Sequence, residues 1–158
     1  MKKRLIGALC LCLALCLSAC GLALSGDAGA DGEETDMIHQ IDIEVNGQIR
    51  TAVLSQNPSA EAFYALLQDG PLTLDMHDYG GFEKVGDLGT SLPRSDEQIT
   101  TSPGDIILYL GNSVTIYYDV NSWNFTLLGY IQDATGENMR EFLGGGNPTV
   151  TFSLHAEP

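Results

Sequence analysis

Basic residues are scarce in this sequence, whereas acidic residues are abundant. Among 158 residues, 7 are Lys or Arg and 21 are Asp or Glu. Three of the seven cations open the chain, and removal of that segment leaves 4 against 21, a formal charge of −17. The four that remain are Arg50, Lys84, Arg94 and Arg140. Because such a surface repels phosphate, we predict that the protein has no nucleic-acid partner.

Cysteine is absent from most of the chain. The four cysteines all lie within the first 20 positions, at Cys10, Cys12, Cys16 and Cys20. A disulfide framework is therefore excluded beyond that segment, and stability must come from a packed core. The hydrophobic content of 44% is normal for a folded chain, and the length suits one domain.

Several motifs of well-known chemistry are also missing. The chain has no G-x-S-x-G nucleophile elbow, no G-x-x-x-x-G-K-[ST] phosphate loop and no G-x-G-x-x-G dinucleotide motif. Of the three histidines, His39 shares a strand face with Ile41, whereas His77 and His155 fall on outer faces by period-two spacing. They do not converge as zinc ligands would, so we predict no metal site and no bound cofactor.

The N-terminus has the pattern of an export signal. A basic start is followed by an apolar run of about 13 residues from Leu5 to Leu17, which is shorter than the roughly 20 residues of a membrane-spanning helix. Leu17-Ser18-Ala19-Cys20 resembles a bacterial lipobox, which implies acylation of Cys20. We therefore predict a lipoprotein signal peptide over residues 1–20. The alternative is an ordinary secretory signal that happens to end in Cys.

This signal predicts where the protein resides. Two or three acyl chains on Cys20 would anchor the exported protein to the lipid bilayer, at the outer face of the bacterial cytoplasmic membrane or at an outer membrane. Residues 21–36 are small and acidic with only two Leu. Such a segment cannot bury enough apolar surface to fold, so we predict a flexible tether. The folded domain should span residues 37–158.

Hydrophobic periodicity in this domain predicts a mainly β structure. Asn46-Gly47 predicts a tight hairpin, and Asn57-Pro58 predicts the start of a helix that Gly70 ends. A second short helix is expected over 137–143, and the span 78–104 is rich in loops. Strands are predicted around residues 37–45, 48–54, 72–77, 82–85, 98–101, 105–110, 114–119, 125–131 and 150–155. About eight strands with two helices favour a closed barrel, since closure removes exposed strand edges.

Several sequence blocks in this domain resemble a known family. The most specific are Pro103-Gly104-Asp105-Ile106-Ile107-Leu108-Tyr109 and Leu128-Gly129-Tyr130-Ile131, with Phe82-Glu83-Lys84-Val85-Gly86 before them. In this order they resemble the bacterial cyclophilin-like domain family over residues 37–156. The resemblance implies a closed eight-stranded antiparallel cyclophilin-like β-barrel with two short helices, one closing each end.

Activity does not follow from this resemblance. Cyclophilin isomerases resemble one another in an F-H-R-x-x-x-x-F-M-x-Q segment, whose Arg stabilises the twisted prolyl amide. The corresponding region here holds Phe82-Glu83-Lys84-Val85 and Leu92-Pro93-Arg94 instead. We therefore predict a non-catalytic domain that binds a peptide or a small molecule in a groove on the barrel surface.

The candidate ligand-binding residues combine aromatic contact area with polar groups, and Arg94 could hold an anionic group. These residues are Tyr79, Phe82, Arg94, Tyr118, Asn121 and Trp123. For each of them the alternative is a purely structural role. Two other functions remain open: a peptidyl-prolyl cis-trans isomerase that uses Phe82 and Arg94, and an accessory domain to a flavodoxin-like redox partner.

Overall fold

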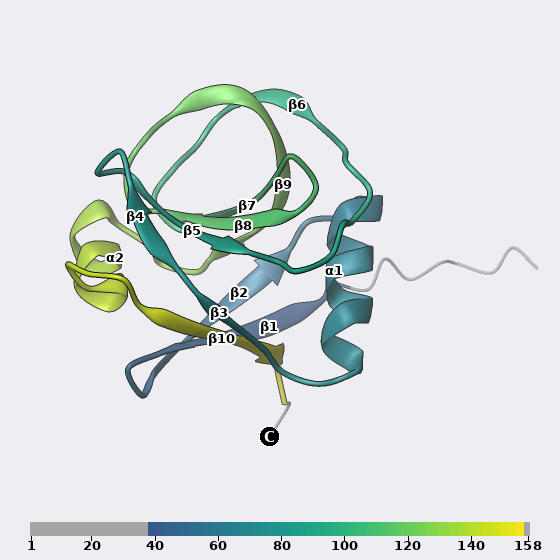
Figure 1. Cartoon of the computed structure of the whole chain (residues 1–158), viewed down its shortest axis with the longest axis horizontal. Coiled ribbons are helices and arrows are strands. Elements are labelled where there is room, and N and C mark those ends of the chain that lie inside the picture. The colour runs from purple at the N-terminus through teal and green to yellow at the C-terminus, as the bar shows by residue number, and fades with distance from the viewer. Residues whose placement is uncertain (1–37, 157–158) are drawn as a thin grey trace, which may run out of the picture. The chain divides into compact units, whose positions relative to one another are not determined.

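The computed structural model of this protein describes residues 38–156 (Figure 1). The predicted signal peptide 1–20 with its lipidated Cys20, the predicted tether 21–36 and Met37 lie outside the described residues. Within the described range, no helix is both long and apolar enough to cross a membrane.

The described residues form ten strands and two helices, as the mainly β prediction expects. In chain order they are β1 (Gln40–Val45), β2 (Gln48–Leu54), α1 (Pro58–Gln68), β3 (Leu72–Asp75), β4 (His77–Tyr79), β5 (Glu83–Asp87), β6 (Glu97–Thr100), β7 (Asp105–Tyr109), β8 (Ser113–Tyr117), β9 (Ser122–Ile131), α2 (Gly136–Leu143) and β10 (Thr149–Leu154). All paired strands are antiparallel.

Local sequence signals explain the first elements. Asn46 and Gly47 adopt φ of 51° and 77°, the left-handed conformation that a two-residue hairpin requires between β1 and β2. The Asn57 side-chain oxygen accepts hydrogen bonds from the backbone N–H groups of Ser59 and Ala60, at 3.0 and 2.9 Å. Pro58 then occupies the first turn of α1, where its missing N–H costs nothing. The predicted hairpin and helix start are confirmed.

The sheet is curled but open. Its hydrogen-bonded order is β3-β10-β1-β2-β9-β7-β8-β5-β4, with β6 paired to β9 beside this path. The two ends of the path, β3 and β4, are separated by Met76 alone and follow one another as one bent, extended segment in Figure 1. The Met76 N–H donates to the Pro148 carbonyl at 2.9 Å, at the point where the segment changes partner strand.

This arrangement corrects the predicted architecture. A closed eight-stranded barrel was expected, but the sheet has ten strands and is not closed. The single strand expected over 72–77 is instead part of a longer segment, which is divided at Met76 into β3 and β4. Because β3 and β4 lie end to end along the chain, no hydrogen-bond ladder joins them.

Side chains from the concave side of the sheet and from both helices form the main core. Phe63 of α1 meets Phe152 of β10 edge to face, with ring centroids 5.6 Å apart. The second helix is found where it was expected, and Met139, Phe142 and Leu143 bury the inner side of this helix, α2. A smaller cluster lies apart from the main core and contains Ile107, Tyr117 and Phe125, with Phe82, Ile99 and Leu127 packed against it.

Candidate functional site

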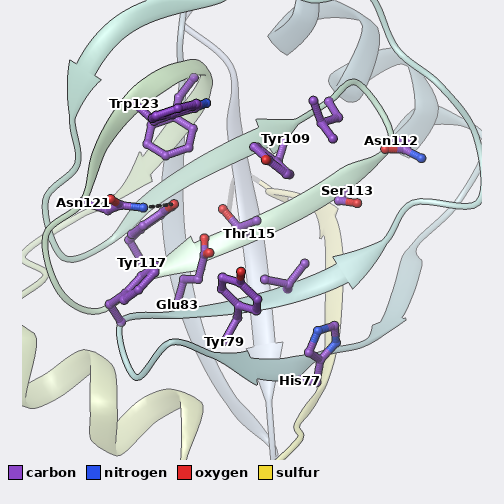
Figure 2. Close-up of a pocket in the computed structure, with 14 residues that line it drawn as sticks. His77, Tyr79, Glu83, Tyr109, Asn112, Ser113, Thr115, Tyr117, Asn121 and Trp123 are labelled. Atoms are coloured by element: carbon purple, nitrogen blue, oxygen red, sulfur yellow. Dashed lines mark hydrogen bonds between the residues drawn. The ribbon is translucent and has the colours of Figure 1, made fainter.

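A pocket of about 680 Å³ lies over the smaller cluster (Figure 2). Successive residues of a strand point to opposite faces of a sheet. Thus Glu83 of β5 and Thr115 and Tyr117 of β8 face the pocket, while their neighbours Lys84 and Ile116 are buried on the other face. The full lining is His77, Tyr79, Phe82, Glu83, Val85, Tyr109, Leu110, Asn112, Ser113, Thr115, Tyr117, Asn121, Trp123 and Phe125.

The turn between β4 and β5 shapes one wall of the pocket. Gly80 and Gly81 both have positive φ, at 63° and 74°. A Cβ on Gly80 would come within 2.2 Å of the Phe82 ring, so glycine lets this ring fold back over the turn. Tyr79 meets Phe82 edge to face, with centroids 6.1 Å apart. The turn therefore presents two aromatic rings to the pocket.

The aromatic rings continue across the pocket floor. Phe82 stacks on Tyr117 at 6.1 Å with an interplanar angle of 14°. Tyr117 in turn contacts Phe125 of β9 at 5.7 Å, and Phe125 meets Tyr109 at 6.4 Å. Such offset and edge contacts hold rings in defined orientations. The floor is thus a connected aromatic surface drawn from four segments of the chain.

Glu83 is the charged group of this pocket. Its side chain is 6% exposed, and Oε2 has no hydrogen-bond partner among residues 38–156. Thr115 Oγ1, across the β5–β8 pairing, is buried and unpartnered in the same way. Burial raises the pKa of Glu83, while the nearby hydroxyls of Tyr117 and Thr115 and the charge of His77 act in the opposite direction. Two buried polar atoms at the pocket, Glu83 Oε2 and Thr115 Oγ1, therefore have no hydrogen-bond partner among the described residues.

Asn121 and Trp123 form the far side of the pocket. The Asn121 backbone N–H donates to Thr101 Oγ1 at 2.9 Å, and its carbonyl accepts from the Thr101 N–H at 2.7 Å. The Asn121 side chain donates to the Tyr117 hydroxyl at 3.5 Å. Trp123 pairs with Ile99 of β6, and its ring is 61% exposed at the rim. Backbone pairing therefore holds an exposed indole beside the cavity.

The structure brings four of the six predicted site residues together. Tyr79, Phe82, Asn121 and Trp123 line the pocket, and Arg94 and Tyr118 do not. Arg94 is exposed on the loop before β6, where its guanidinium pairs with Asp96. The sequence alone could not place Arg94, because this loop has no periodicity that relates it to a face of the sheet.

Tyr118 lies outside the pocket lining and is buried in the main core. Its hydroxyl donates to Asp78 Oδ2 at 2.5 Å, and the Arg140 guanidinium lies over its ring at 4.8 Å from the centroid. Burial, reinforced by the hydrogen bond to Asp78, raises the pKa of Tyr118 to about 12. The neighbouring residue Tyr117 occupies the position in the pocket instead.

Sequence reasoning missed Glu83, Thr115 and Tyr117. A signal for them existed, since Glu83 and Val85 alternate with Lys84, and Thr115 and Tyr117 alternate with Ile116. However, both faces of β5 and β8 are buried. Period-two spacing then separates the faces without showing which one borders a cavity.

The three histidines lie in separate environments. His39 stacks on Tyr64 at 3.8 Å and lies 3.4 Å from Glu61. His155 Nδ1 is 2.8 Å from Asp42 Oδ1, and His77 is at the edge of the pocket. Within the part of the chain that the structure describes, no three His, Cys, Asp or Glu side chains are grouped to hold a metal ion.

Comparison with known proteins identifies the family. A search of curated proteins found no match. The model of the cyclophilin-like family matches residues 43–153, which include every strand of the sheet except the start of β1 and the last residue of β10. The match covers more than half of the chain, and the chain therefore belongs to the cyclophilin-like family.

Proposed function

We propose that this domain binds a peptide segment or a small molecule in the aromatic pocket. The observation that carries the proposal is a cavity of about 680 Å³ whose lining includes two buried polar atoms, Glu83 Oε2 and Thr115 Oγ1, without hydrogen-bond partners in the described part of the chain. Ligand sites in proteins are mostly apolar cavities of about 300–1,000 Å³ with a few convergent polar groups.

The rim of the pocket supports binding as well. Tyr79 and Trp123 are 59% and 61% exposed, and the adjoining Leu110 is 59% exposed. Large apolar side chains that gather at one place on a surface are typical of interaction sites. Aromatic side chains supply much contact area at a small cost in conformational entropy. A ligand that covers this rim would remove apolar surface from water.

We propose that the domain binds its ligand without catalysing a reaction. Prolyl isomerisation has a barrier of about 18–20 kcal/mol, and lowering it requires a donor placed on the twisted amide. Among the residues lining the pocket there is no Lys or Arg, and Arg94 pairs with Asp96. A protease-coupled assay with a prolyl peptide should show little acceleration. Strong acceleration that Phe82→Ala abolishes would favour the isomerase.

Binding is tested by comparing two exposed tyrosines. A library of peptides and small molecules is screened for compounds that raise the unfolding midpoint of the protein. We expect Tyr79→Ala to reduce the shift that a hit produces. Tyr130→Ala should leave it unchanged, because Tyr130 is 49% exposed but lies outside the pocket lining. Hits that are equally sensitive to both variants, or to neither, would contradict binding in this pocket.

We further propose that the domain is held at a membrane through acylated Cys20. The support is the lipobox-like Leu17-Ser18-Ala19-Cys20 after a short apolar run. Labelled palmitate should be incorporated into the wild-type protein and into Cys16→Ser, but not into Cys20→Ser. Equal labelling of the two variants, or release of an unlabelled wild-type protein, would overturn the anchor.

A further inference from the structure

We propose that the pocket selects an organic cation, an ammonium or guanidinium group on a small molecule or a peptide side chain, with Glu83 as its counter-ion. This inference rests on the proposed function, because it names the ligand class of the same pocket. Three observations support it. They are the position of the Glu83 carboxylate, the contacts of the Lys and Arg side chains with groups outside the pocket, and the aromatic rings around the pocket.

The position of Glu83 suits it to accept hydrogen bonds from a ligand. It is 6% exposed, and Oε2 has no hydrogen-bond partner among the described residues. Figure 2 shows the carboxylate pointing into the cavity between Tyr117, Tyr79 and Thr115. A carboxylate accepts hydrogen bonds and offers none, so a ligand that satisfies it must donate. A buried, unpaired charge is costly, and a cationic donor removes more of this cost than a neutral one.

No side chain with a permanent positive charge lies in the pocket lining. Residues 38–156 contain four Lys and Arg against fifteen Asp and Glu, a formal charge of −11. Each of the four cations contacts a group outside the pocket lining: Arg50 lies over Phe142, Lys84 pairs with Asp78, Arg94 with Asp96, and Arg140 with Asp119.

The net charge of the domain and the local charge at Glu83 both favour a cationic ligand. At long range the acidic domain attracts cations and repels anions. At short range, no Lys or Arg among the described residues lines the cavity beside Glu83. The anionic ligand that Arg94 suggested from the sequence is therefore not the one that this pocket favours.

The aromatic walls suit the same ligand. The faces of aromatic rings carry partial negative charge and attract cations within about 6 Å of the ring centre, most strongly when the site is shielded from water. Tyr79 and Phe82 come from the β4–β5 turn, Tyr109 from β7 and Trp123 from β9, so three segments of the chain place aromatic rings around the cavity that contains Glu83. A cation seated on the carboxylate would therefore have ring faces close by.

Titratable groups around Glu83 predict how binding depends on pH. Tyr117 and Thr115 face it from β8, Tyr79 and His77 lie on β4, and Asn121 is neutral. Acidification protonates Glu83, and the loss of its negative charge disfavours a bound cation. Affinity for a cation should therefore fall as the pH is lowered through the raised pKa of Glu83.

The first experiment needs no variant of the protein. Trp123 is the single Trp of the chain and lies at the pocket, so its fluorescence reports on ligands there. The full-length protein in detergent is titrated with acetyl-Gly-Arg-Gly-amide and with its citrulline counterpart, which has nearly the same shape and no charge. We expect the arginine peptide to bind about tenfold more tightly or better, since a hydrogen bond to a charged group contributes more than a neutral one. Equal affinities would overturn the cation proposal.

A second experiment assigns the selectivity to Glu83. Glu83→Gln keeps the shape of the side chain and removes its charge, and it should abolish the preference for arginine over citrulline. Glu44→Gln is the matched control, because it removes one acidic charge from an exposed position of β1 outside the pocket. The thermal unfolding of both variants is recorded to confirm folding. A preference for arginine that persists in Glu83→Gln would overturn the role of the carboxylate.

The source of the cation is resolved by a third titration. Agmatine carries a guanidinium and an amine without a peptide backbone. Tighter binding of agmatine than of the arginine peptide would assign the pocket to small amines, and the reverse would assign it to a peptide side chain. If hits from the general screen bind the pocket while neither cation is preferred over citrulline, pocket binding stands and the cation proposal fails. If no compound of any charge perturbs Trp123, the binding function itself fails.

Discussion

Glu83 and Lys84 are consecutive residues of β5, and their side chains lie on opposite faces of the sheet. Both are buried, with exposures of 6% and 1%. Lys84 Nζ donates to Asp78 Oδ2 at 2.9 Å and to the Gly146 carbonyl at 2.8 Å, and it lies 5.6 Å from the centre of the Tyr118 ring. The Glu83 Oε2 atom has no such partner among the described residues.

The two faces of β5 therefore differ in how a buried charge is compensated. On the core face, the ammonium joins β5 to β4 and to the loop before β10, so its charge supports the packing of the chain. On the pocket face, we expect the buried carboxylate to lower the stability of the fold, because its Oε2 atom has no hydrogen-bond partner among the described residues. Local disagreement with the rules of stable packing is typical of functional sites.

On the core face, the charge of Lys84 is balanced by a carboxylate with a lowered pKa. The hydrogen bond from Tyr118, followed by the one from Lys84, lowers the pKa of Asp78. Asp78 is thus ionised over the range in which most proteins are stable, and it compensates a buried cation. At Glu83 the balance is reversed, because desolvation is the largest influence on the pKa and outweighs the lowering effects of Tyr117, Thr115 and His77.

The largest effect that separates the two faces should come from Ile116→Ala. Ile116 is fully buried in the main core, next to the pocket residue Thr115 on β8. Truncating a buried Ile leaves a cavity, so we expect a loss of about 4 kcal/mol in the free energy of unfolding. Urea denaturation measures it. A loss below about 1 kcal/mol would mean that this face is not the tightly packed one.

Asp78→Ala should have the next largest effect. It removes the carboxylate that compensates the buried Lys84, and a buried charge left without its partner costs about 3 kcal/mol. Lys84→Met should cost less, because the Asp78 side chain is 41% exposed and can be hydrated. A double-mutant cycle measured by urea denaturation gives the coupling energy. Additive single effects would show that the ion pair contributes nothing to the core face.

Glu83→Gln should stabilise the protein at neutral pH, by about 1 kcal/mol, because it removes a buried unpaired charge. The pKa of Glu83 in the folded state is raised above its ordinary value of 4.5. Its contribution is therefore most favourable below pH 4.5 and is lost as the pH rises through the folded-state pKa.

The advantage of Glu83→Gln should consequently vanish at low pH. Unfolding free energies of wild type and variant, measured between acid and neutral pH, test this sign. A variant that is less stable than the wild type at neutral pH would show that Glu83 is compensated within the protein.

Thr115→Val should have the smallest effect on stability. The substitution keeps the shape of the side chain and removes a buried hydroxyl whose Oγ1 has no partner in the described part of the chain. We expect the free energy of unfolding to change by less than about 1 kcal/mol, towards greater stability. Thermal unfolding measures it. A large loss would reveal that Thr115 supports the pocket floor structurally.

Short-range patterns explain which parts of the fold were predictable. The hairpin at Asn46-Gly47 needs positive φ at two adjacent residues, and the start of α1 needs the cap that Asn57 supplies. Both requirements are met by residues a few positions apart. The closure of the sheet was predicted wrongly, because it depends on how the segment around Met76 shares its pairing between β10 and β5.

The predicted site residues also divide into those that line the pocket and those that do not. Tyr79, Phe82, Asn121 and Trp123 could be found from the sequence, because aromatic and amide side chains in loop-rich segments are typical of binding sites. Arg94 and Tyr118 fell outside the lining because the loop conformation and the choice between the adjacent residues Tyr117 and Tyr118 depend on distant contacts.

The acidic charge of the domain, its mainly β character, both helices and the family could all be read from the amino-acid sequence. These properties depend on composition, on period-two and helical spacing and on local caps, each of which acts over a few residues. The open sheet, and the placement of Glu83 towards a cavity and Lys84 towards the core, became visible in the folded chain. Both outcomes depend on strand pairings between residues far apart in the chain. The register Glu83 to Tyr117 is one of them, and no local pattern encodes it.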